Sequence, residues 1–143
     1  MLLGEFRHTI DDKNRLAVPA KFRKMIESGA VVTRGLDECL FLYPKAAWQA
    51  WAQRLATLPI SQAKSRAFLR MMLGGAMEVD VDKQGRVMIP DYLREYAQLK
   101  KNVVVAGLYD RLELWDAEKW KQYQSQNEKE SAHIAETLSQ MGV

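Results

Sequence analysis

Two short segments combine an acidic and a basic side chain at the same spacing. They are Asp11-Asp12-Lys13-Asn14-Arg15 and Asp82-Lys83-Gln84-Gly85-Arg86. An aspartate can accept hydrogen bonds from the amides of a turn and can also orient an arginine through a salt bridge. An arginine presents a planar fork of five N–H donors that matches phosphate oxygens or the O6/N7 edge of guanine. The pattern indicates contact with nucleic acid, and the candidate DNA-binding residues are Asp11, Lys13, Arg15, Asp82, Lys83 and Arg86.

The same two segments admit a purely structural interpretation, in which the aspartate and the arginine only fix a turn against its neighbour. The charge distribution favours the nucleic-acid interpretation. Residues 1–76 hold 12 lysines and arginines against 6 acidic residues, whereas residues 77–143 hold 9 against 12. Such an imbalance is typical of a chain that meets a polyanion with one side. Because Arg7, Lys21, Arg23 and Lys24 lie near the first segment in sequence, we expect that segment to contribute more of the affinity.

The composition is that of an ordinary globular protein. The chain has 143 residues, of which 48% are hydrophobic and 27% are charged, and its net charge is +3. Disordered chains have fewer apolar residues and a larger net charge. No apolar stretch approaches the ~20 residues of a membrane-spanning helix. Residues 1–5 lack the basic and apolar regions that begin a signal peptide, so we expect a protein of the cytoplasm.

The sequence carries no signature of an enzyme. It contains no Gly-x-Ser-x-Gly elbow, no Walker or Rossmann glycine pattern and no His-Glu-x-x-His. Cys39 and two histidines offer neither a disulfide nor the spacing of zinc ligands. Cys39 lies in an apolar strand pattern, which is typical of a buried thiol. We therefore expect no catalysis, no cofactor, no metal and no small-molecule substrate.

The chain repeats itself with a shift of 71 residues. Residues 1–23 fall on residues 72–94 with seven identities, which in the first copy are Met1, Leu2, Gly4, Asp11, Arg15, Pro19 and Arg23. A shift of 72 then aligns Trp48 with Trp120, so one residue is inserted between the blocks. Small units expose a large share of their surface, and we expect the two copies to pack into a single domain.

The residue pattern of each copy predicts the order strand, strand, helix, strand, strand. Apolar alternation predicts a half-buried strand before each charged turn, and Asn14 and Gly85 tolerate the positive φ that the tip of a hairpin turn requires. A short strand follows and ends at Pro19 or Pro90, where a short helix is expected to begin. The last two strands of each copy are expected at residues 31–33 and 40–43, and at residues 103–106 and 112–115.

Helices are expected in the remaining segments. Residues 44–58 place tryptophans at helical spacing, and Ser61 is a candidate N-cap for a following helix. Asp116 is a candidate N-cap for a polar helix after the second copy. We expect an α+β fold that forms one pseudo-twofold β-barrel domain with added helices. Its parts are repeat 1 at residues 5–47, a helical connector at 48–75, repeat 2 at 76–119 and a C-terminal helical tail at 120–143.

Several separated motifs, taken in order, closely resemble the MraZ family of bacterial transcriptional regulators. They are Leu3-Gly4-Glu5-Phe6, the two Asp-x-x-x-Arg turns with Leu16-Ala17-Val18-Pro19 and Val87-Met88-Ile89-Pro90, Thr33-Arg34-Gly35-Leu36-Asp37, Leu40 to Pro44, and Leu73-Gly74-Gly75-Ala76. The match covers nearly the whole chain and weakens after about Gln122. The family's first turn usually has glycine where this chain has Asn14, which also adopts left-handed geometry.

The resemblance implies two AbrB-like swapped-hairpin repeats in each chain. It also implies sequence-specific binding to repeated boxes in the promoter of the division and cell-wall gene cluster, usually as a repressor. Members of the family assemble as ring-shaped octamers or dodecamers, so the expected partners are double-stranded promoter DNA in the nucleoid and further copies of the chain. The family's DNA-contacting motif maps onto Asp11 to Arg15 and onto Asp82 to Arg86.

Two other classes of function stay open. The same fold could be the antitoxin-like partner of a toxin, with the polar helix after Asp116 as its binding surface. It could also be a structural ring that coats nucleoid DNA without sequence preference, which competition with unrelated DNA would reveal.

Overall fold

A computed structural model describes all of residues 1–143, and its elements follow the repeat. The first copy contains β1 (Leu2–Thr9), β2 (Arg15–Ala17), the 3-10 helix η1 (Ala20–Phe22), α1 (Arg23–Ile26), β3 (Ala30–Arg34), β4 (Leu40–Pro44), α2 (Lys45–Leu55) and α3 (Ala63–Met72). The second copy contains β5 (Met77–Val79), β6 (Arg86–Met88), α4 (Asp91–Tyr96), β7 (Asn102–Tyr109), β8 (Leu112–Asp116), α5 (Ala117–Glu128) and α6 (Ser131–Ser139). The expected α+β order of strand, strand, helix, strand, strand is confirmed in both copies.

The two copies exchange strands and do not fold separately. β1 pairs antiparallel with β7, and β5 pairs antiparallel with β3, so the first strand of each copy joins the third strand of the other. The second strands, β2 and β6, pair with each other in a two-stranded sheet. The six-stranded sheet has the order β1-β7-β8-β4-β3-β5, which reads the same in reverse when the two copies are exchanged. This is the pseudo-twofold arrangement that the repeat predicts and the swapped hairpin that the family resemblance implies.

The β-strands do not close into a barrel, which corrects one part of the expectation. β1 and β5 are free edges of the six-stranded sheet, and the β2–β6 pair forms a separate sheet. β5 has three residues where β1 has eight, because residues 73–76 complete the turn after α3 and do not extend the strand. The short strand β5 leaves too few residues at this edge of the sheet for the hydrogen-bonded ladder to continue around the core.

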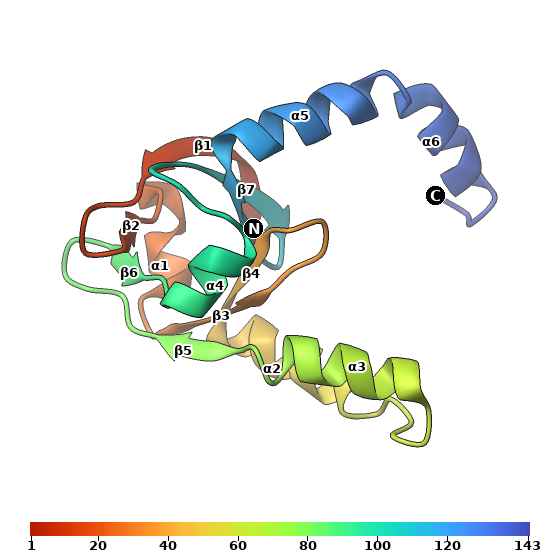
Figure 1. The fold of residues 1–143 in the computed structure, drawn as a ribbon, viewed down its shortest axis with the longest axis horizontal. Coiled ribbons are helices and arrows are strands. Elements are labelled where there is room, and N and C mark those ends of the chain that lie inside the picture. The colour runs from red at the N-terminus through yellow and green to blue at the C-terminus, as the bar shows by residue number, and fades with distance from the viewer.

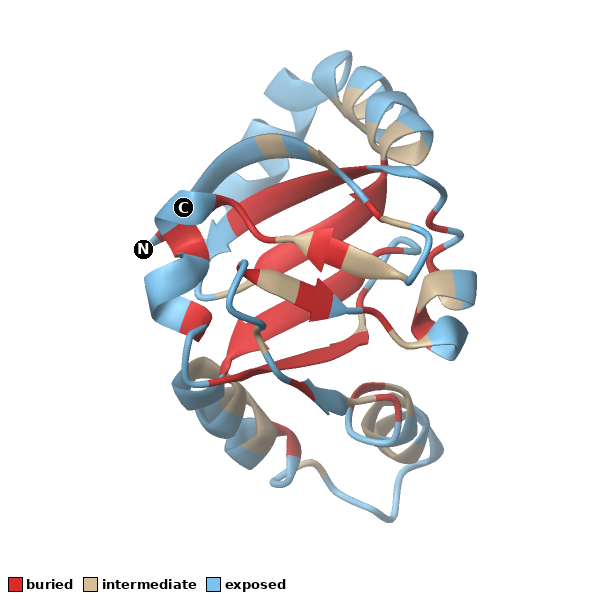
Figure 2. Ribbon diagram, turned by 90° about the vertical axis from the view of Figure 1, so that its left-hand side faces the viewer, coloured by how far each residue is buried: buried red, intermediate tan, exposed pale blue.

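The main core lies between the six-stranded sheet and a layer formed by β2, β6, α1 and α4. Its fully buried side chains include Leu16, Phe22, Leu42, Val87 and Leu93. Figure 2 shows the buried strands in the middle of the molecule and the more exposed helices around them. Because Leu16 and Val87 anchor β2 and β6 to this core, the charged turns that precede these strands have a fixed base.

A second apolar cluster covers the outer face of the same sheet, beneath α2, α3 and α5. The ring centroid of Trp48 in α2 lies 5.6 Å from that of Tyr43, and the centroid of Trp120 in α5 lies 5.3 Å from that of Trp115. These are equivalent contacts in the repeat. Figure 1 shows two helical arms, α2–α3 and α5–α6, which project from the side of the molecule opposite the turns before β2 and β6.

The helix boundaries partly agree with the sequence prediction. Asp116 caps α5, because its carboxylate accepts a hydrogen bond from the amide of Lys119 at 3.3 Å. Ser61 is not the N-cap of α3, which begins after Gln62 without a side-chain cap. α2 ends at Leu55, three residues before the predicted end of that helix. The polar tail forms two helices, and neither contains a buried residue.

Candidate nucleic-acid interface

The carboxylate of Asp11 holds the first charged turn together. Its Oδ1 atom accepts hydrogen bonds from the amides of Lys13 and Arg15, both at 2.9 Å, and its Oδ2 atom accepts one from Nε of Arg15 at 2.7 Å. Asn14 has a φ of 60°, the left-handed geometry expected at the tip of the turn. The spacing from aspartate to arginine therefore lets one carboxylate fix both the backbone and the guanidinium.

The second turn repeats this geometry in detail. Oδ1 of Asp82 accepts hydrogen bonds from the amides of Gln84 and Arg86 at 2.9 Å, and its Oδ2 atom accepts one from Nε of Arg86, also at 2.9 Å. Gly85, with a φ of 75°, occupies the position of Asn14. Both turns thus present an arginine whose orientation is set by an acid four residues earlier.

These hydrogen bonds lower the pKa of both aspartates. In each turn the largest cause is the hydrogen bond from the backbone amide of the arginine, and the bond from its side chain adds to the effect. Partial desolvation acts in the opposite direction and raises the pKa, but the hydrogen bonds prevail. Asp11 and Asp82 are therefore ionised at neutral pH, and each turn contains a charged pair.

The two-stranded sheet brings the two turns together. Arg15 stands opposite Met88 in the β2–β6 ladder, and Ala17 stands opposite Arg86. Nη1 of Arg86 lies 3.8 Å from Oδ2 of Asp11, the same atom that accepts the bond from Arg15. The side chains of the two arginines therefore meet around one carboxylate, on the same side of the molecule.

Both guanidinium groups keep donors for a partner. The side chain of Arg15 is 28% exposed and that of Arg86 is 26% exposed. The salt bridges to aspartate occupy Nε in both residues, as the structural interpretation of the motif expects. The terminal nitrogens of Arg15 make no hydrogen bond within the chain. Fixing the turn and offering donors to a partner are thus compatible roles for the same side chain.

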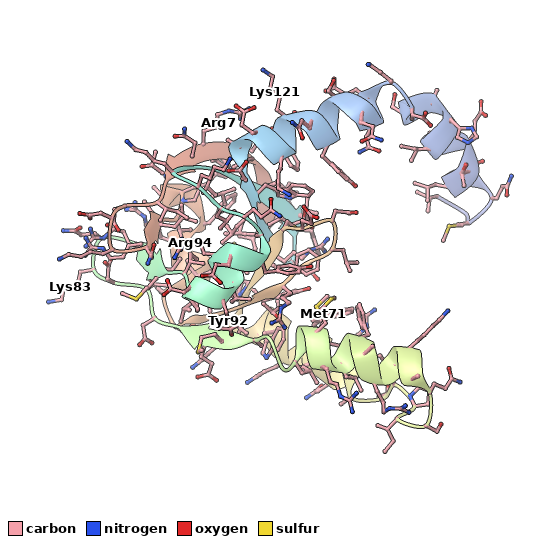
Figure 3. The ribbon with its side chains drawn as sticks, in the orientation of Figure 1. Arg7, Met71, Lys83, Tyr92, Arg94 and Lys121 are labelled. Atoms are coloured by element: carbon pink, nitrogen blue, oxygen red, sulfur yellow. The ribbon has the colours of Figure 1, made fainter.

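The two lysines of the predicted site are exposed at the turns. Lys13 and Lys83 make no salt bridge within the chain. In Figure 3 Lys83 extends from the far end of its turn, away from the body of the protein. The structure thus gathers all six predicted residues on the two turns, with the arginines at the base and the lysines nearer the tips.

Strand exchange gives each turn neighbours from the other copy. Arg23 of the first copy lies against the second turn, where a Cβ on Gly85 would collide with its guanidinium, and its Nε donates to the carbonyl of Val18 at 3.1 Å. Arg23 is thus near the first turn in the sequence but lies against the second turn in the structure. Nearness in sequence misleads here, because β1 and β2 carry the first turn across to the second copy.

Asp91 and Arg94 of α4 are the corresponding neighbours of the first turn. Oδ1 of Asp91 accepts hydrogen bonds from Nδ2 of Asn14 at 3.2 Å and from Nη2 of Arg94 at 3.0 Å. The sequence analysis did not assign either residue to the site. The available signal was the repeat itself, which aligns Arg94 with Arg23.

The structure shows no candidate metal cluster. It brings together no group of three or more His, Cys, Asp or Glu residues that could hold a metal ion. None of its helices combines the length and the apolar character needed to cross a membrane. Cys39 is fully buried, as predicted for a thiol in an apolar strand pattern, and this burial raises the pKa of the thiol.

Comparisons with known proteins agree with the repeat. A family model described as "MraZ protein, putative antitoxin-like" matches residues 1–71 and again residues 72–141. A protein of Natranaerobius thermophilus named transcriptional regulator MraZ is 47% identical over 138 residues, which is 96% of each chain. A protein of Desulfitobacterium hafniense with the same name is 45% identical over 143 residues, which is 100% of each chain. The family model thus finds the same two consecutive copies that the sequence repeat indicates.

Proposed function

The chain belongs to the MraZ family, and from this we propose that it is a DNA-binding transcriptional regulator that reads promoter DNA with its two charged turns. The observation that carries the proposal is the meeting of Arg15 and Arg86 around the carboxylate of Asp11. A paired, oriented set of guanidinium donors is suited to the edges of bases and to phosphate oxygens.

Each residue of the turns has a proposed role. Arg15 reads base edges in the major groove, while Lys13, Lys83 and Arg86 contact phosphates or bases. Asp11 and Asp82 set the geometry of the turns and orient the arginines through the hydrogen bonds described above. The roles differ because a planar arginine fork distinguishes one base from another, whereas a lysine acts on phosphate as a point charge.

Repetition of the chain strengthens a weak individual contact. One chain carries few unpaired positive charges at its turns, so its own affinity is low and falls with salt, by ~0.9 in log K per decade of salt for each phosphate neutralised. We propose a ring-shaped octamer or dodecamer whose subunits engage successive promoter boxes. Effective concentration then raises the overall affinity by ~10²- to 10⁴-fold without any new contact.

The regulated promoter is proposed from the family. The protein acts in the cytoplasm, on nucleoid DNA, and represses its own division and cell-wall gene cluster by occupying repeated boxes upstream of it. Footprinting on the DNA upstream of the protein's own gene tests this directly. Protected boxes at a regular spacing would support both the promoter and the ring.

The role of the turns is tested by the binding of Arg15→Ala to the footprinted DNA and to an unrelated duplex. We expect Arg15→Ala to cost ~1–3 kcal/mol on the footprinted DNA for each engaged subunit and to reduce the preference for it. Lys13→Ala should weaken binding to both duplexes evenly. Lys121→Ala on α5 is the control, because Figure 3 shows this side chain on a helical arm, far from the turns. Wild-type binding by Arg15→Ala at moderate salt would overturn the assignment.

An antitoxin-like interaction module is the second candidate. It is favoured by the wording of the family model and by α5 and α6, in which no residue is fully buried, so that their outward faces are exposed. Co-purification of a small protein in equal amount, with no DNA retained at low salt, would support this candidate against the regulator.

A further inference from the structure

We propose that a cleft beside the first turn binds a phosphate of the DNA backbone, held by Lys100 and Lys101. The proposal rests on the proposed DNA-binding function and extends it to residues outside the charged turns. Lys100 and Lys101 belong to the second copy, yet strand exchange places them next to the turn of the first copy.

The cleft has a volume of about 670 Å³ and two walls. Residues 9–12 and Asn14, from the end of β1 and the first turn, form one wall, and Arg94 with the segment 99–101 forms the other. The walls are joined at their base by the hydrogen bond from the amide of Ile10 to the carbonyl of Lys101 at 2.9 Å. This bond fixes the position of the lysine pair relative to Arg15, so one strand of DNA could meet both.

The balance of unpaired charge in the cleft is positive. Lys100 and Lys101 are exposed and make no ion pair within the chain. Of the two acids in the opposite wall, Asp11 is already paired with Arg15, and only Asp12 is free. Two free ammonium groups against one free carboxylate favour an anion. Flexible lysine side chains can reach a phosphate oxygen without a fixed bonding geometry.

Arg94 lines the cleft and has one unsatisfied donor. Its Nη2 atom is paired with Asp91 at 3.0 Å, but its Nε atom is buried and has no hydrogen-bond partner. Its repeat equivalent, Arg23, satisfies the same atom with the carbonyl of Val18. The arginine beside the first turn is therefore less completely satisfied than the one beside the second turn.

The lysine pair distinguishes the two turns. The corresponding segment of the first copy, residues 27–30, contains no lysine, so the second turn has no equivalent of this pair. The pseudo-twofold axis relates the two charged turns to each other, but it does not relate the residues that lie beside them. Contacts that do not depend on base sequence are thereby concentrated beside the first turn, which gives the bound DNA a preferred orientation.

The test compares the salt dependence of binding for the double variant Lys100→Gln, Lys101→Gln with that of the wild type. The probes are the footprinted upstream DNA and an unrelated duplex of the same length. Loss of two phosphate contacts should reduce the slope of log K against log salt by ~1.8 for each engaged subunit. The preference for the footprinted DNA should remain. The matched control is Lys121→Gln, Lys129→Gln on and after α5, which removes the same charge far from the turns and should keep the wild-type slope.

The outcomes separate this inference from the proposed function. The double variant could keep the wild-type slope of log K against log salt, or lose no more of it than the control does. Either result would overturn the phosphate site, but it would not bear on the proposed role of the charged turns. A double variant that loses the preference for the footprinted DNA would also overturn the phosphate site, because the lysines would then take part in base recognition. A wild type that shows no preference and no salt dependence would overturn the proposed function itself.

Discussion

Nη1 of Arg86 lies 3.8 Å from Oδ2 of Asp11, although the two residues belong to different copies of the repeat. The same oxygen accepts the hydrogen bond from Nε of Arg15 at 2.7 Å. Asp82 has no such double role, since its only cationic partner is Arg86. The two turns are therefore related by symmetry in their backbones but not in their ion pairs. Asp11 is the residue that links them.

The first prediction compares Asp11→Asn with Asp82→Asn. Asparagine keeps an oxygen that can accept the bonds from the turn amides but loses the charge that orients arginine. Asp11→Asn weakens the hold on both Arg15 and Arg86, whereas Asp82→Asn affects Arg86 alone. We expect the dissociation constant for promoter DNA to rise several-fold for Asp11→Asn and less for Asp82→Asn, measured by fluorescence anisotropy.

A control for this comparison is Asp12→Asn, which removes an exposed acid that has no partner in the chain. This variant should bind DNA as well as the wild type or slightly more tightly, because it only removes repulsion from phosphate. Equal losses for Asp11→Asn and Asp82→Asn would show that the cross-copy ion pair does not matter for binding.

The second prediction concerns pH. The pKa values of Asp11 and Asp82 are lowered from their ordinary value of 3.8, chiefly by the amides of Arg15 and Arg86. A carboxylate with a lowered pKa in the folded state stabilises the protein above its unfolded pKa, and this contribution is lost as pH falls through the folded pKa. The difference in unfolding free energy between the wild type and the double variant Asp11→Asn, Asp82→Asn should be constant from pH ~7 to ~5. It should shrink below pH ~4, as measured by urea denaturation. A difference that already disappears near pH 6 would contradict this assignment.

The third prediction tests the base of the turns. Leu16 is fully buried in β2 and stands opposite Val87, which is fully buried in β6. Leu16→Ala should lower the free energy of unfolding by ~2–5 kcal/mol, through lost burial and the cavity left behind. The control, Met88→Ala, changes an exposed residue of the facing strand and should cost within ~0.5 kcal/mol. Similar stabilities of the two variants in chemical denaturation would mean that the two-stranded sheet is not anchored as described.

Much of the local structure could be predicted from the sequence, because local chemistry determines it. Positive φ at Asn14 and Gly85 follows from residue type at the tip of a turn. The cap at Asp116 follows from a side-chain oxygen placed before a helix. The order of strands and helices in each copy follows from apolar periodicity and from the repeat, which supplied the same pattern twice.

The neighbours of the turns could not be predicted in the same way, because they depend on which strands pair. Alternation in β1 shows which face is buried, but it does not identify β7 as the partner strand. Nearness in sequence therefore did not show that Arg23 lies against the second turn, or that Arg94 lies beside the first. The open barrel was missed for a similar reason, since the length of β5 depends on where α3 ends and not on the residues of the strand alone.

The last prediction concerns the pairing that carries the first turn across to the second copy. Gly107 in β7 stands opposite Gly4 in β1, and a Cβ at Gly107 would lie 2.6 Å from the backbone carbon of Leu2 and 2.6 Å from the amide nitrogen of Leu3. Backbone atoms in a ladder cannot move aside as a flexible side chain can. Gly107→Ala should therefore push β1 away and destabilise the fold by ~1–3 kcal/mol. Hydrogen exchange should show faster exchange of the amides of residues 2–9, while Leu108→Ala, at the exposed neighbouring position, should leave them protected. Wild-type protection of these amides in Gly107→Ala would mean that β1 is not held against β7 as closely as the structure places it.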